Sequence, residues 1–178
     1  MHAFDNSNAE SDGLPEAPRG SAVKAPQERR DSERVITDWE QETRRLGRAL
    51  ALMNLNVAEM TSESWANRFV IAVGATPEDC AFLFYGAQFA ALMELPAKPD
   101  HSAPLIAQLP ARYVPVFAKA CVQAALHGAP VRAQGTVDRE DGGQEHYRSA
   151  FIALRHQSNR QQRLVFGSFN CRVAERQD

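Results

Sequence analysis

The stretch from Val131 to Val173 decides the fold class, because it predicts three β-strands joined by two turns. It runs VRAQGTVD (131–138), REDGG (139–143), QEHYRSAFIALR (144–155), HQSNRQQ (156–162) and RLVFGSFNCRV (163–173). Asp141-Gly142 marks the first turn, since tight primed hairpin turns need positive φ and Asp and Gly tolerate it. Three strands leave an apolar face, so the rest of the chain must supply a covering layer.

The composition indicates one folded domain with an appendage. The chain has 178 residues, of which 44% are hydrophobic, and a formal net charge of -2. This charge provides no basic field for nucleic acid or a membrane surface, and we expect the protein to bind neither. No apolar run approaches the roughly 20 residues that cross a bilayer, and the start lacks a secretory pattern. Cys80, Cys121 and Cys171 lie far apart in apolar surroundings, which is typical of reduced thiols in the cytoplasm.

The N-terminal third predicts a disordered tail followed by a helix. Residues 1–33 are polar and Pro-rich and cannot bury enough surface to offset chain entropy, and we expect residues 174–178 to form a second short tail. Thr37-Asp-Trp-Glu40 fits a capping box, and apolar residues follow in steps of three and four, so a long amphipathic helix is predicted over 34–60. This apolar stripe predicts packing on the domain, with a further contribution to a dimer. The candidate dimer or docking residues are Trp39, Leu46, Leu50, Met53 and Val57.

The middle of the chain predicts two more strands and a set of helices. Short apolar runs at 69–73 and 80–85 are typical of buried strands. Helices are expected at 87–94, for one turn at 104–109, and at 110–127, where Gly128 suits the left-handed residue after the last turn. The chain is therefore predicted to be α+β, with a five-stranded antiparallel sheet and helices inserted between strands two and three.

This order of elements resembles the PAS domain family over residues 65–173. The matching stretches are FLFYGAQFAAL (82–92), VRAQGTVDREDGG (131–143), YRSAFIAL (147–154) and LVFGSFN (164–170). The chain is also similar to small stand-alone bacterial PAS-type proteins. The resemblance implies a sensory or interaction module in bacterial signalling.

The sequence contains none of the common catalytic motifs, and we do not expect an enzyme. GxSxG, HExxH, GxxxxGK[ST] and GxGxxG are all absent, and no metal and no cofactor are expected. His127 ends a helix, where a protonated ring interacts favourably with the helix dipole. Asn170-Cys171-Arg172 has the letters of a flavin photosensor motif, but it lies on the last strand.

Aromatic residues on the predicted strands and helices suggest where a ligand would bind. The candidate pocket residues are Phe82, Phe84, Phe89, Tyr113, Phe117, Phe151 and Ile152. Both faces of the last two strands are largely apolar, so the second face is expected to be covered by the helix after Thr37. A filled core without a ligand explains the same residues.

Three classes of function follow. The first is a non-enzymatic PAS-type module that acts as a homodimer or by docking to a signalling partner protein. The second is a receptor for a small molecule or cofactor, such as haem, flavin or a metabolite, between sheet and helices. The third is a small enzyme of a related cavity fold, with an isolated acid–base pair.

Overall fold

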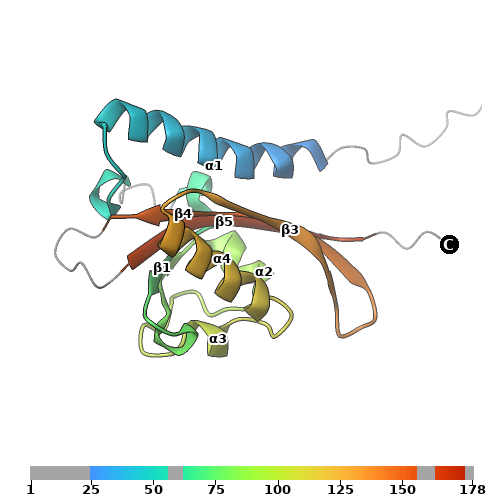
Figure 1. Ribbon diagram of the computed structural model, residues 1–178. Coiled ribbons are helices and arrows are strands. Elements are labelled where there is room, and N and C mark those ends of the chain that lie inside the picture. Colours follow the sequence, from blue (N-terminus) through green and yellow to red (C-terminus); the bar gives the residue numbers. More distant parts are fainter. Residues whose placement is uncertain (1–24, 56–61, 156–162, 175–178) are drawn as a thin grey trace, which may run out of the picture.

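The computed structural model describes residues 25–55, 62–155 and 163–174, which form a sheet with helices on both faces (Figure 1). The helices are α1 (Ala25–Leu46), α2 (Ala87–Leu92), α3 (Leu105–Gln108) and α4 (Val114–His127). The strands are β1 (Arg68–Val73), β2 (Ala81–Tyr85), β3 (Val131–Asp138), β4 (Gln144–Leu154) and β5 (Arg163–Val173).

The sheet confirms the predicted fold class. Its strand order is β2-β1-β5-β4-β3, and every neighbouring pair is antiparallel. The helices α2, α3 and α4 come between β2 and β3 in the chain, as predicted. Gly128 ends α4 with a φ of 66°, because the left-handed conformation suits a residue without a β-carbon.

The molecule has three layers, with the sheet between α1 and the other helices (Figure 1). We call the face covered by α2–α4 the inner face and the face covered by α1 the outer face. Neighbouring side chains on a strand point to opposite faces, so Phe151 is buried in the inner core and Ile152 in the outer one. Burial on both faces explains why β1 and most of β5 read as almost continuous apolar runs.

The helix at the N-terminus has other bounds than predicted. It covers Ala25–Leu46 and not 34–60, so residues 25–33 are helical where a disordered tail was expected. It ends because Gly47 takes a φ of 63° and its amide donates to the Arg44 carbonyl at 3.3 Å. Leu50 and Ala51 then run beside the end of β4, and the Arg155 amide donates to the Leu50 carbonyl at 2.6 Å.

Parts of the predicted tails and of this helix lie outside the described residues. These parts are residues 1–24, residues 56–60 with the docking candidate Val57, and residues 175–178. Leu52–Asn54 forms a short 3-10 helix and does not continue α1.

The turn between β3 and β4 is a five-residue loop and not the predicted two-residue primed turn. Gly142 has a φ of 78°, whereas Asp141 is not among the residues with positive φ. The Asp141 carboxylate instead accepts a hydrogen bond from the Gly143 amide at 3.0 Å. The Gly142 amide donates to the Arg139 carbonyl at 3.1 Å, and the Arg139 amide to the Gly143 carbonyl at 2.8 Å. A primed type I turn needs positive φ at both central residues, and only Gly142 provides it.

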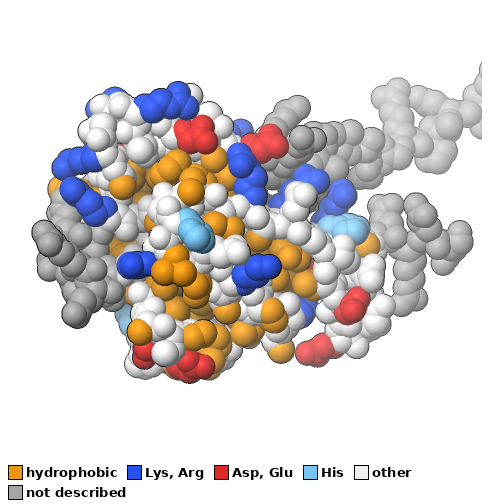
Figure 2. Space-filling view, in the orientation of Figure 1, with side chains coloured by type: hydrophobic (Ala, Val, Ile, Leu, Met, Phe, Trp, Pro, Cys, Tyr) orange, Lys and Arg blue, Asp and Glu red, His pale blue; other side chains and the backbone are white. Residues whose placement is uncertain are grey.

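The surface of the inner-layer helices is mixed in character. Figure 2 shows Lys and Arg side chains spread around a hydrophobic area at the centre of this view. α4 exposes Val122 and Leu126, which lie one turn apart on the same side of the helix. Among the helices of residues 25–55, 62–155 and 163–174, none is long and apolar enough to cross a membrane.

Candidate functional site

The seven predicted pocket residues do not line one cavity, because the sheet separates them. Five of them belong to the inner core and are fully buried: Phe82, Phe89, Tyr113, Phe117 and Phe151. Phe84 and Ile152 contact the outer core on the opposite face. Side chains on the two faces of one sheet cannot meet around a single ligand.

Three of the five inner residues pack around Phe69, which the sequence prediction missed, while Phe82 contacts Phe89 and Tyr113 contacts Phe169. The Phe69 ring centroid lies 5.1 Å from that of Phe89, 5.3 Å from Phe117 and 5.4 Å from Phe151. These are ordinary separations for edge-to-face and tilted aromatic pairs in a core. The rings therefore fill the space in which a ligand was predicted.

The outer face carries the predicted docking helix. Val35 and Ile36 of α1 are buried in the same cluster as the outer-face side chains of β1, β4 and β5. Trp39 and Leu46 pack partly buried against this cluster, and Leu50 is buried within it. Met53 is 64% exposed and does not continue the stripe. The stripe of α1 therefore faces its own sheet.

Farther along the outer face, polar atoms replace the apolar contacts. Ser168 of β5 is fully buried, and neither its Oγ nor the Nδ2 of Asn170 has a hydrogen-bond partner within the described residues. On α1 the same holds for Ser32 Oγ, Trp39 Nε1 and Thr43 Oγ1. Such a group loses its hydrogen bonds to water without replacement, at a cost of about 1–3 kcal/mol. The contact between α1 and the sheet therefore combines a stabilising apolar part with a destabilising polar part.

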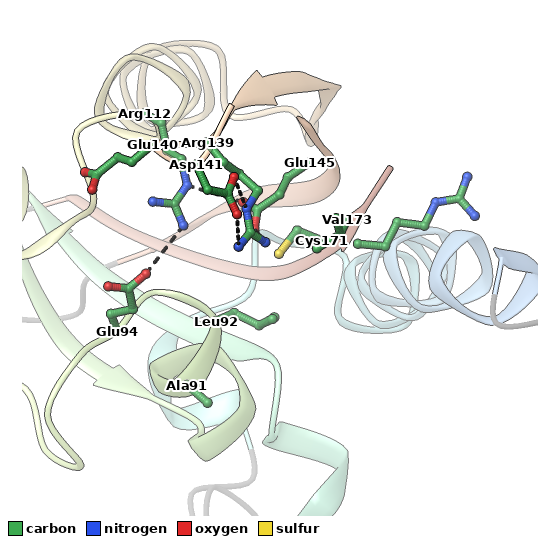
Figure 3. A pocket seen from close by; sticks show the side chains of 11 residues that line it. Ala91, Leu92, Glu94, Arg112, Arg139, Glu140, Asp141, Glu145, Cys171 and Val173 are labelled. Carbon is green, nitrogen blue, oxygen red and sulfur yellow. Dashed lines mark hydrogen bonds and ion pairs between the residues drawn. The ribbon is translucent and has the colours of Figure 1, made fainter. Parts of the chain in front are cut away.

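A cluster of charged side chains around Glu145 lies at one end of the inner layer (Figure 3). The Glu145 side chain is 8% exposed and lies on β4, while Arg112 and Tyr113 directly precede α4 and Arg139 belongs to the β3–β4 loop. Tyr113 Oη donates to Glu145 Oε2 at 2.7 Å, and Arg112 Nε donates to the same oxygen at 3.2 Å. Arg139 Nη1 donates to Oε1 at 3.2 Å. Both carboxylate oxygens of this buried charge are thus paired.

An open pocket of about 460 Å³ adjoins this cluster. Its lining residues are Ala91, Leu92, Glu94, Arg112, Arg139, Glu140, Asp141, Glu145, Cys171, Arg172 and Val173. Arg139 is also held by Asp141, at 3.0 Å, whereas Arg112 reaches Glu94 only at 3.6 Å. The Glu94 side chain is 76% exposed, and its backbone has a φ of 55°, which is uncommon for a residue with a side chain.

The phenol of Tyr113 acts as a hydrogen-bond donor in this cluster. Burial raises its pKa well above the ordinary value of tyrosine, and the hydrogen bond to Glu145 raises it further. Burial likewise raises the pKa of the Cys121 thiol in the inner core. Both groups therefore keep their protons at neutral pH, and neither is an activated nucleophile.

Sequence reasoning missed the Glu145 cluster because its members come from three separate elements. One signal was present: Glu145 is two residues before Tyr147 and four before Ser149, and therefore on the inner face of β4. A carboxylate on a buried face must find a partner, and such a pattern predicts a charge network.

No protein-family model matches this sequence, and no curated protein matches it significantly. The geometry of the outer face and of the Glu145 cluster therefore carries the functional inference.

Proposed function

We propose that this protein is a non-enzymatic PAS-type sensory or interaction module of bacterial signalling. It acts in the cytoplasm, and its interaction surface is the outer face of the sheet together with α1. The observation that carries the proposal is the mixed contact between α1 and the outer face. It combines a buried apolar cluster with polar atoms that have no hydrogen-bond partner within the described residues.

Stabilising and destabilising contributions oppose each other in the contact between α1 and the sheet. This makes α1 the element that a partner can displace. Burial of apolar surface stabilises the contact by about 25 cal/mol per Å². The five polar atoms oppose it, because none has a hydrogen-bond partner within the described residues. A partner that offers hydrogen bonds to Ser168 and Asn170 gains what α1 does not supply, and this difference in contacts shifts the population of the covered state.

The test compares two substitutions that act on α1 in opposite directions. Ile36→Ala removes buried apolar contact and speeds amide hydrogen exchange in α1, whereas Ser168→Ala removes an unpartnered hydroxyl and slows it. Exchange in α4 serves as the internal control and stays unchanged in both variants. If α1 and α4 exchange together in the native protein and in Ile36→Ala, α1 is a permanent part of the core and the proposal fails.

A second candidate function is a receptor for a small ligand that carries a carboxylate. The observation that favours it is the long contact of Arg112 Nη2 with the exposed Glu94 on the pocket rim, at 3.6 Å, while Arg112 Nε is held by Glu145 at 3.2 Å. A ligand carboxylate that replaced Glu94 would form the bidentate pair that guanidinium groups favour.

Native mass spectrometry and an absorption spectrum of fresh protein test for a retained ligand or cofactor. Thermal shifts with a panel of small carboxylates then test Arg112 directly. Arg112→Gln abolishes the shift, while the exposed Lys119→Gln on α4 leaves it intact. A shift that persists in Arg112→Gln would exclude this site.

The arrangement of the cluster supports a binding role over catalysis. A general base must direct an oxygen or nitrogen atom at a substrate proton within hydrogen-bond reach. Both oxygens of Glu145 already accept hydrogen bonds, and Tyr113 retains its proton. We therefore do not propose the small-enzyme class.

A further inference from the structure

The strand β3 forms one edge of the sheet and has the properties of a pairing surface. It pairs with β4 over all eight of its residues, Val131–Asp138, without a bulge. It contains no proline, and within the described residues no further strand adds to its other side. Natural edge strands are usually shortened, bulged or covered, because free backbone groups attract another strand.

The direction of the backbone groups follows from the loop at the end of the strand. The Arg139 amide donates to the Gly143 carbonyl, so residue 139 directs its backbone groups toward β4. These directions alternate along an antiparallel strand, so the even-numbered residues direct theirs toward the open side. The four residues with open backbone groups are Arg132, Gln134, Thr136 and Asp138, and all four are exposed.

We propose that a second copy of this chain pairs with this edge, β3 against β3 and antiparallel, about a twofold axis at Gly135. In this register Arg132 lies opposite the partner's Asp138, and Gln134 lies opposite the partner's Thr136. Ala133 lies opposite the partner's Val137. The open residues face open residues, so the amide and carbonyl groups of all four are paired in each copy.

The side chains are complementary in this register alone. Arg132 forms no ion pair with any described residue, and Asp138 accepts one hydrogen bond, from Gln144 Nε2 at 3.1 Å. The twofold axis brings two such Arg–Asp pairs together on the outer face. A shift of the axis to Gln134 or Thr136 loses both pairs.

Gly135 suits the position at the axis. Two residues that face each other between hydrogen-bonded pairs approach to about 4.5 Å between their α-carbons. On the inner face a β-carbon at Gly135 would already lie 3.0 Å from Tyr147 Oη. The Tyr147 ring therefore covers Gly135 on the inner face, and no side chain at residue 135 obstructs the approach of a second strand. This inference does not depend on displacement of α1.

Sedimentation velocity of the full chain over a concentration series tests the proposal. The native protein is expected to dimerise reversibly. Gln134→Pro removes an outward amide that makes no bond to β4, so the variant keeps the native circular dichroism spectrum and stays monomeric. A native protein that remains monomeric at high micromolar concentration overturns the proposal, and so does a dimer that Gln134→Pro leaves intact.

Charge reversal tests the register itself. Arg132→Asp and Asp138→Arg each place like charges opposite one another and weaken the dimer about tenfold. The double variant Arg132→Asp/Asp138→Arg restores the pairs and the native dissociation constant. Failure of the double variant to restore dimerisation, with both singles weakened, rejects the register about Gly135.

Discussion

At the residue scale, Tyr113 connects the aromatic core with the charged cluster. Its ring centroid lies 5.0 Å from that of Phe169, while its hydroxyl donates to Glu145. The side chain thus packs as an aromatic and also pairs a buried carboxylate, a combination that phenylalanine cannot offer.

Tyr113→Phe is expected to lower the free energy of unfolding by about 1–3 kcal/mol, because Glu145 loses a hydrogen bond at a buried site. Urea unfolding followed by circular dichroism measures the change. Tyr147→Phe is the matched control, since no hydrogen bond of the Tyr147 hydroxyl lies within the described residues. Equal losses in the two variants would show that the bond to Glu145 contributes nothing.

The raised pKa values of Tyr113 and Cys121 predict a loss of stability at alkaline pH. Their ordinary values are 10.0 and 9.0, and burial raises both in the folded protein. Above these ordinary values the unfolded chain releases protons that the folded protein keeps. The free energy of unfolding therefore falls as pH rises, by up to about 1.4 kcal/mol per pH unit for each group.

Urea unfolding at a series of pH values measures this slope. The pKa values of Cys80 and Tyr85 are also raised by burial, so Tyr113→Phe removes one of several contributions and makes the decline above pH 10 shallower. A slope unchanged in this variant would assign the alkaline loss to other groups.

At the scale of single elements, the two helices that end in a left-handed glycine form a matched pair. Gly47 and Gly128 have φ values of 63° and 66°, and a β-carbon at either would meet nothing within 4 Å. Alanine there is opposed by backbone conformation alone, which costs about 1 kcal/mol. The two sites end different helices, so the same substitution tests α1 and α4 separately.

Gly47→Ala is expected to loosen α1 and to speed its hydrogen exchange, while Gly128→Ala acts on α4 and β3. Hydrogen exchange resolved by mass spectrometry distinguishes the two effects. Faster exchange throughout the sheet in Gly47→Ala would mean that α1 is inseparable from the core.

At the scale of the whole molecule, the sheet lies between two hydrophobic cores, one on each face. Phe151 and Ile152 are neighbours on β4 and are both fully buried, one in each core. A sheet with one solvated face would bury only one of them.

Phe151→Ala and Ile152→Ala are both expected to destabilise the protein, by about 3–5 and 2–5 kcal/mol. The control Lys119→Ala on α4, at an exposed position, changes stability by less than about 0.5 kcal/mol. Chemical denaturation measures all three. A loss below 1 kcal/mol in Ile152→Ala would show that α1 does not cover the outer face in solution.

The strands, the insertion of helices between β2 and β3, and the left-handed residue at Gly128 were all predictable from local patterns. Each depends on the spacing of apolar residues or on the conformational freedom of one glycine, and both are properties of neighbouring residues. The end of α1 at Leu46 was also encoded, by Gly47, but the apolar stripe continued past it and the periodicity gave a longer helix. The spacing of apolar residues does not show where a helix ends if the segment after it also buries apolar side chains at a similar spacing.

The sequence by itself determined the α+β class, the antiparallel sheet and the need for a cover on both faces. The tertiary structure alone decided which rings meet around Phe69 and that Glu145 pairs with Arg112, Tyr113 and Arg139. It also decided that buried hydroxyls between α1 and the sheet have no partner among the described residues. The physical reason is that such contacts join residues far apart in the chain. Their distances depend on how helices and strands pack, and no pattern within one element carries that information.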